Sequence, residues 1–131
     1  MEDWPFGYDE LEQYYDKVEW EVGVSGNAGN VNGKKDPKGN IFEAPRKREY
    51  PMPALRWTGW LEKMADAAKG LGWHPFAGPA SINTRSFQNR SGCMYHGFCN
   101  RGGCHVDAKN STAVTTIPRA EATGQIGRAH V

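Results

Sequence analysis

The chain has 131 residues, of which 38% are hydrophobic, and it contains 16 glycines and 8 prolines. This length suits one ordinary domain, but so much glycine and proline predicts that loops dominate the structure. The 16 Lys and Arg against 15 Asp and Glu leave a net charge of +1, which gives no electrostatic reason to expect a nucleic acid or an anionic membrane as partner. No apolar run approaches transmembrane length.

The first predicted element is a helix that starts near Asp9 and ends at Gly23. Asp9 can cap its N-terminus, with Glu12 completing a capping box. The helix carries an apolar stripe at helical spacing, which is expected to face the core. The stripe consists of Leu11, Tyr14, Tyr15, Val18 and Val22.

A Gly- and Asn-rich stretch, residues 24–40, follows this helix and is interpreted as a surface loop. Its glycines do not have the G-x-G-x-x-G spacing of a phosphate loop, and no strand precedes them. Next comes the basic run Arg46-Lys47-Arg48, flanked by Glu43 and Glu49. Such a run is typical of a solvated or ion-paired stretch rather than of a nucleic-acid patch.

A second helix is predicted from about Thr58 to Lys69, with Thr58 as N-cap and Gly70 as C-cap. Its expected buried stripe is Leu61, Met64, Ala65 and Ala68. Residues 73–82 are expected to be extended, on an edge or irregular path because of two prolines. A last short helix is expected over residues 111–117, capped by Ser111 and stopped by Pro118.

All three cysteines lie in one glycine-rich segment, with the spacing C-x5-C-x4-C. Thiolates this close in sequence are candidate metal ligands or reactive thiols. Cys93, Cys99 and Cys104 could hold a [3Fe-4S] cluster, because thiolates are the usual ligands of such iron. They could instead bind zinc together with His96 or His105, as a small zinc-stabilised binding module, although structural zinc ligands are usually paired more closely. The third interpretation is structural, with no metal at all.

Two stretches of the chain resemble one enzyme family. The opening segment reads WP-x-x-Y-x-x-L-x-x-YY-x-x-x-E from Trp4 to Glu19, and the second stretch runs from Gly92 through the cysteines to Ala113. Both resemble the glucose-methanol-choline (GMC) oxidoreductases, especially their gluconate 2-dehydrogenase-like flavoprotein subunits. In that family, similar three-cysteine loops either carry a [3Fe-4S] centre or pack beside the flavin as buried thiols or a disulfide. One gap in the cysteine spacing here differs by a residue from the iron-binding pattern.

The resemblance implies a loop-rich, α+β internal fragment, residues 3–125, of a larger FAD-binding α/β enzyme. It implies oxidation of a CH-OH group of a sugar, sugar acid or alcohol, with electrons passed to a non-nicotinamide acceptor. Such a parent would have a cytochrome c or a small subunit as partner. In this comparison Asn110, Ser111 and Thr112 would contact FAD. No residue matches the family's catalytic histidine, so no catalytic residue is assigned and the fragment alone is expected to be unstable and inactive.

Two further expectations concern the ends and the compartment. Residues 126–131, Ile-Gly-Arg-Ala-His-Val, are what a common sequencing-library adapter encodes when read in frame, so we interpret them as an artefact of sequencing. Because family members are often exported and attached to a membrane-bound cytochrome, a periplasmic or peripheral inner-membrane location is suspected.

Overall fold

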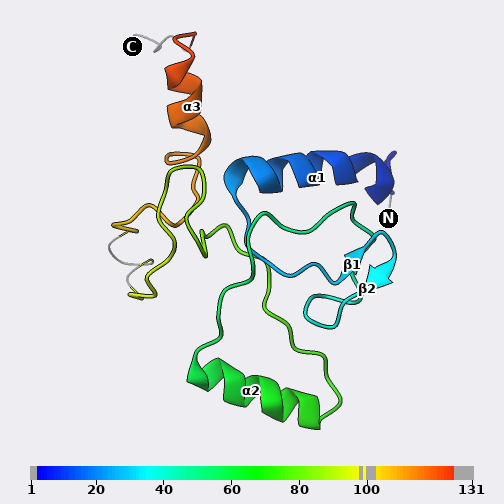
Figure 1. Ribbon diagram of the computed structural model, residues 1–131. Coiled ribbons are helices and arrows are strands. Elements are labelled where there is room, and N and C mark those ends of the chain that lie inside the picture. The colour runs from blue at the N-terminus through cyan, green and yellow to red at the C-terminus, as the bar shows by residue number, and fades with distance from the viewer. Residues whose placement is uncertain (1–2, 98, 100–102, 126–131) are drawn as a thin grey trace.

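The computed structural model describes residues 3–97, 99 and 103–125, and Figure 1 shows their arrangement. Helix α1 spans Tyr8–Val22, α2 spans Gly59–Gly70 and α3 spans Thr116–Ala122. Two short strands, β1 (Asn30–Val31) and β2 (Lys34–Lys35), form an antiparallel hairpin. Long irregular segments join these elements, as the glycine and proline content predicts, and the predicted adapter residues 126–131 lie outside the described part. None of the helices in the described ranges is long and apolar enough to cross a bilayer.

Helix α1 follows the predicted helix closely, but its ends differ in how they are capped. The N-cap position is Gly7, which provides no side chain, so the capping box predicted for Asp9 and Glu12 is wrong. The C-terminal prediction is confirmed: Gly23 has φ +91° and its N–H donates to Glu19 O at 2.9 Å. This left-handed conformation favours glycine, because a Cβ would clash there.

The face of α1 that points into the molecule is acidic, and the predicted apolar stripe largely faces solvent. Glu12 is only 6% exposed, whereas Tyr14, Tyr15 and Val18 are 61%, 51% and 55% exposed. The prediction that this stripe packs on the core is therefore wrong for those three residues. The acidic face points inward because its carboxylates form ion pairs with the basic run, residues 46–48.

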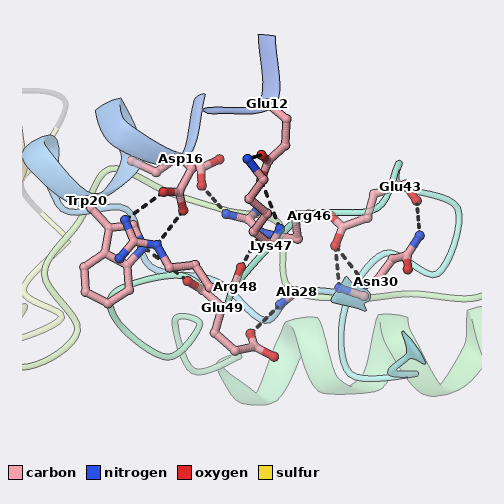
Figure 2. Close-up of polar contacts among 12 residues, drawn as sticks. Glu12, Asp16, Trp20, Ala28, Asn30, Glu43, Arg46, Lys47, Arg48 and Glu49 are labelled. Atoms are coloured by element: carbon pink, nitrogen blue, oxygen red, sulfur yellow. Dashed lines mark hydrogen bonds and ion pairs between the residues drawn. The ribbon is translucent and has the colours of Figure 1, made fainter. Parts of the chain in front are cut away.

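The acidic row Glu12, Asp16 and Glu19 pairs with the basic run, residue by residue (Figure 2). Arg46 binds Glu19, and Arg48 makes two 2.7 Å bonds to the Asp16 carboxylate. The remaining acid, Glu12, accepts the backbone N–H of residue 47 at 2.9 Å and lies 3.3 Å from the same residue's Nζ. The interpretation of residues 46–48 as an ion-paired stretch is confirmed.

Carboxylates and aromatic rings complete this interlock around the hairpin. The Glu43 carboxylate accepts the N–H groups of Gly29 and Asn30, at 2.6 and 3.1 Å. The guanidinium of Arg46 lies 3.8 Å from the centre of the Tyr50 ring, a cation–π geometry. Burial raises the pKa of Tyr50 to about 12. Charged groups therefore hold α1 against residues 28–50.

The segment predicted as a surface loop, residues 24–40, instead contains the hairpin and part of the buried centre. Asn32 and Gly33 both have positive φ, +51° and +82°, which is the type I′ geometry that an Asn-Gly pair favours in two-residue hairpins. Ser25 and Ala28 are fully buried, at 0% and 1% exposure. The surface-loop interpretation was wrong because glycines here allow close backbone packing: a Cβ on Gly29 would lie 2.2 Å from backbone atoms of residue 40.

Ser25 is the meeting point of three chain segments. Its N–H and C=O bond to Ala80 at 2.8 and 2.9 Å, and the next N–H, of Gly26, donates to Met52 O at 2.9 Å. Met52 is 1% exposed and is the largest fully buried side chain among the described residues. The centre of the structure is thus built from backbone pairing around small side chains rather than from an extensive apolar core.

Helix α2 lies away from α1, at the end of two extended connections (Figure 1). Thr58 takes the predicted N-cap position but makes no side-chain capping bond. The predicted cap at Gly70 is wrong, because the helix includes it and Gly72, with φ +77°, adopts the left-handed conformation instead. Of the predicted buried stripe only Ala65 is buried, while Leu61 and Met64 are about half exposed.

Helix α3 begins five residues later than predicted. Residues 112–115 form turns, and the helix runs from Thr116 to Ala122 with Pro118 inside its first turn. Proline is tolerated there because the first N–H groups of a helix have no intrahelical acceptor. The predicted helix over residues 111–117, stopped by Pro118, is therefore wrong.

Candidate functional site

The cysteine loop, residues 93–105, is attached to the rest of the chain through backbone bonds at its two ends. The N–H of Cys93 donates to Asn83 O, and the N–H of Asn83 donates to Ala108 O, each at 2.7 Å. Asn83 and Ala108 are completely buried. Asn83 thus holds the two ends of the loop together, although Cys93 and Ala108 are 15 residues apart in sequence.

The three predicted cysteines line one small cavity, which we call the cysteine hollow. All three are free thiols and half-buried. The hollow has a volume of about 20 Å³, room for about one water molecule. Its lining consists of Cys93, Met94, Tyr95, His96, Gly97, Cys99, Gly103, Cys104, His105 and Val106.

Backbone N–H groups point at two of the sulfurs. Ala108 N donates to Cys104 Sγ at 3.2 Å, and Tyr95 N donates to Cys93 Sγ at 3.4 Å. Burial alone would raise the pKa of Cys104, but the N–H groups of Val106, Lys109 and Ala108 outweigh it and hold this pKa below its usual value of 9.0. Donors of this kind stabilise a thiolate, so the geometry makes Cys104 a candidate nucleophile.

The two histidines of the loop lie beside each other. The rings of His96 and His105 stack with centroids 4.8 Å apart and an angle of 13° between their planes. Tyr95 connects the loop to the segment just before α2. Its hydroxyl accepts the N–H of Arg56 at 2.9 Å, and the Arg56 guanidinium lies 4.8 Å from the centre of its ring. The loop is thereby fixed at a second point.

The described residues give no support for a [3Fe-4S] cluster. Within residues 3–97, 99 and 103–125, no three Cys, His, Asp or Glu side chains are arranged to hold a metal ion. A cavity that holds about one water is also smaller than a cluster of seven atoms. The zinc alternative gains no support for the same reason. Ligation by Cys93, Cys99 and Cys104 stays a prediction from the sequence.

Asn110, predicted to contact FAD, is 6% exposed, and its side chain is bonded inside the protein. Its Nδ2 donates to Gly23 O and, at 2.8 Å, to Asn83 Oδ1, while its Oδ1 accepts a bond from Arg90. Its backbone N–H donates to Ser81 O at 2.8 Å. Asn110 therefore joins the C-terminus of α1 to the base of the cysteine loop.

Ser111 and Thr112, the other two predicted FAD contacts, have exposed side chains. Their carbonyl groups are used inside the turn: Ser111 O accepts from Val114 N at 3.1 Å and Thr112 O from Ile117 N at 3.0 Å. Both hydroxyls are therefore accessible to a ligand. Contact with FAD remains a prediction for all three positions.

Sequence reasoning missed the Asn83–Asn110 pair. The separation of 27 residues concealed it, because only the fold brings the two amides together.

No protein-family model matches the chain. The chain is 30% identical over 126 residues to the gluconate 2-dehydrogenase flavoprotein of Pantoea cypripedii, covering 90% of this chain and 20% of that protein. It is 31% identical over 118 residues to the paromamine 6′-oxidase of Streptomyces fradiae, covering 89% of this chain and 19% of that protein.

A third relative is the fructose dehydrogenase large subunit of Gluconobacter japonicus, 29% identical over 97 residues. That match covers 74% of this chain and 16% of the relative. The chain thus spans about a fifth of the length of the curated relatives that it matches, and all three are named as oxidoreductases of sugars or sugar derivatives.

Proposed function

This chain is homologous to oxidoreductases of the GMC type over about nine-tenths of its length, and from that relationship we propose that residues 3–125 form an internal part of a longer FAD-dependent dehydrogenase. The parent would have the α/β fold of an FAD-binding enzyme, of which this α+β part is one piece. The observation that carries the proposal is the breadth of the match, which extends along most of this chain in relatives that act on related compounds.

The proposed reaction is the oxidation of a CH-OH group in a sugar, sugar acid or alcohol. FAD, when bound, would accept a hydride from the substrate carbon, and the electrons would then pass to an acceptor other than a nicotinamide. A relative is named as a large subunit, which supports a second subunit or a cytochrome as that acceptor. The catalytic base would lie outside this chain.

Residues of this chain have a positioning role in the proposal. Asn110 ties Asn83 to the end of α1 and so fixes where residues 111 and 112 emerge. The exposed hydroxyls of Ser111 and Thr112 would then face the flavin. Cys104, whose sulfur accepts the N–H of Ala108, would lie beside the flavin.

The source locus provides the test of this proposal. A long-read sequence should contain, upstream of Asp3 and in frame, a strand–helix unit with G-x-G-x-x-G. Downstream, a segment with a histidine should replace residues 126–131. A gene that begins at Met1 and stops after Val131 would contradict the proposal.

A further inference from the structure

Helix α1 turns an aromatic and aliphatic face toward solvent. Tyr14, Tyr15 and Val18 are each more than half exposed, and Trp4, just before the helix, is 79% exposed. With Phe6, which is 40% exposed, these side chains form what we call the aromatic face. Contiguous apolar surface of this kind is rare on a free protein and marks an interaction site.

The orientation of this face is imposed by the charged interlock on the adjacent face of the helix. Glu12, Asp16 and Glu19 recur at i, i+4 and i+7, so they lie on one side of α1, and all three bind residues 46–48. Rotating α1 to bury the aromatic face would separate every one of these pairs. The aromatic face is therefore available for an external contact.

At its N-terminal end the aromatic face is hollowed. The hollow has a volume of about 510 Å³ and is lined by Trp4, Phe6, Gly7, Tyr8, Leu11 and Tyr15. The rings of Trp4 and Phe6 are 5.7 Å apart, and those of Tyr8 and Tyr15 stack at 6.2 Å. Aromatic pairs that line a concavity are the anchors of apolar interfaces.

We propose that the aromatic face docks onto an apolar surface of the parent polypeptide, in the part that this chain does not span. This inference rests on the proposed function, and specifically on the longer parent. About four-fifths of the length of the matched relatives lies outside the matched region, which supplies the occupant within the same molecule. The acidic row is already paired inward, so the contact that remains for the aromatic face itself is apolar.

Hydroxyl-radical footprinting of the parent polypeptide, expressed from the recovered locus, tests the proposal. The reference is a synthetic peptide of residues 3–23, whose side chains are fully accessible. An uncovered Tyr14 and Tyr15 would keep about half of the peptide's labelling, as their exposures of 61% and 51% require. Docking predicts labelling several-fold below that level.

A pair of variants in the parent gives a second reading. Val18→Asp places a charge on the aromatic face, whereas Gln13→Asp places the same charge at an exposed position whose amide bonds only to Glu10 O. We expect V18D to restore labelling of Tyr14 and Tyr15 and to lower the thermal midpoint by several degrees, with Q13D near wild type.

Flavin content and turnover of the parent are measured alongside the labelling. Failure of the docking proposal can then be told apart from failure of the proposed function. Protection in a parent that binds no FAD supports the docking face and contradicts the proposed function. Half-maximal labelling in a parent that binds FAD overturns the docking proposal. Protection that disappears on dilution also overturns it, because the occupant is then a second copy of the chain.

Discussion

Two regions of this molecule, residues 8–50 and residues 81–110, are each stabilised by different chemistry. Residues 8–50 depend on charge, with three carboxylates of α1 paired to three consecutive basic residues. Residues 81–110 depend mainly on two buried amides: Asn83 and Asn110 bond to each other, to the carbonyls of Gly23, Phe87 and Ser91, and to the Arg90 guanidinium. The first region should respond most to loss of a charge on α1 or on residues 46–48, and the second most to loss of either amide.

The largest expected effect is in the charged region. Arg46→Met removes the partner of Glu19 and the cation above Tyr50, and the Arg46 side chain is only 8% exposed. Breaking such a pair leaves the half-buried Glu19 carboxylate unpaired, which should lower the free energy of local opening by about 3 kcal/mol. Hydrogen exchange of the α1 amides in the parent polypeptide measures it.

The control for this variant is Arg48→Met, whose side chain is 48% exposed and whose loss should matter far less. Equal effects of the two substitutions would contradict the importance of burial in this region.

Next in size is a backbone effect at the hairpin. Gly29→Ala places a Cβ 2.2 Å from the carbonyl of residue 40, which is backbone and cannot rotate away. The hairpin must shift, at about 2 to 3 kcal/mol. Gly59→Ala is the matched control, because nothing lies within 4 Å of its added Cβ and alanine favours the helix. Exchange of the amides at 29–31 should accelerate only in the first variant.

A smaller effect is expected where the neutral region is broken. Asn110→Ala removes donors and an acceptor from buried partners and should cost about 2 kcal/mol in opening of the cysteine loop. Faster alkylation of Cys104 at pH 7 would report this opening. Ser111→Ala, at an exposed position, should leave alkylation unchanged while weakening FAD if the hydroxyl faces it. An unchanged Cys104 rate in N110A would show that Asn110 does not fix the loop.

The smallest effect separates the two regions by pH. The hydrogen bonds from Arg48 hold the pKa of Asp16 below 3.8. A lowered carboxylate pKa stabilises the fold at pH values above the unfolded pKa, and this contribution is lost as the pH falls through the folded value. Wild type and Asp16→Asn should therefore differ in peptic cleavage of α1 at pH 4 to 5 and converge near pH 2. Cleavage of the neutral region should not distinguish them at either pH.

The sequence predicted both long helices, because their hydrophobic spacing and the glycine after α1 are local signals. It did not predict which face of α1 is buried. Apolar spacing predicts that one face of the helix is buried, but Glu12, Asp16 and Glu19 have an equally regular spacing on the neighbouring face. Whether the apolar or the acidic row is buried depends on residues 46–48, about thirty positions away. A local pattern contains no information on that pairing.

The candidate site divides in the same way. That the cysteines gather around one point was predictable from their closeness in the chain, and it agrees with the cysteine hollow. The internal role of Asn110 was not predictable, because its partners at Gly23 and Asn83 are 87 and 27 residues away.

The central claim is that this chain belongs to an FAD-dependent dehydrogenase of sugars or related alcohols. The most direct test is the visible spectrum of the purified parent polypeptide, recorded under anaerobic conditions before and after addition of gluconate, fructose or other polyols. We predict a flavin spectrum that bleaches with at least one of them and is restored by an artificial electron acceptor but not by a nicotinamide. A parent that contains no flavin after purification and reconstitution with FAD would contradict the account.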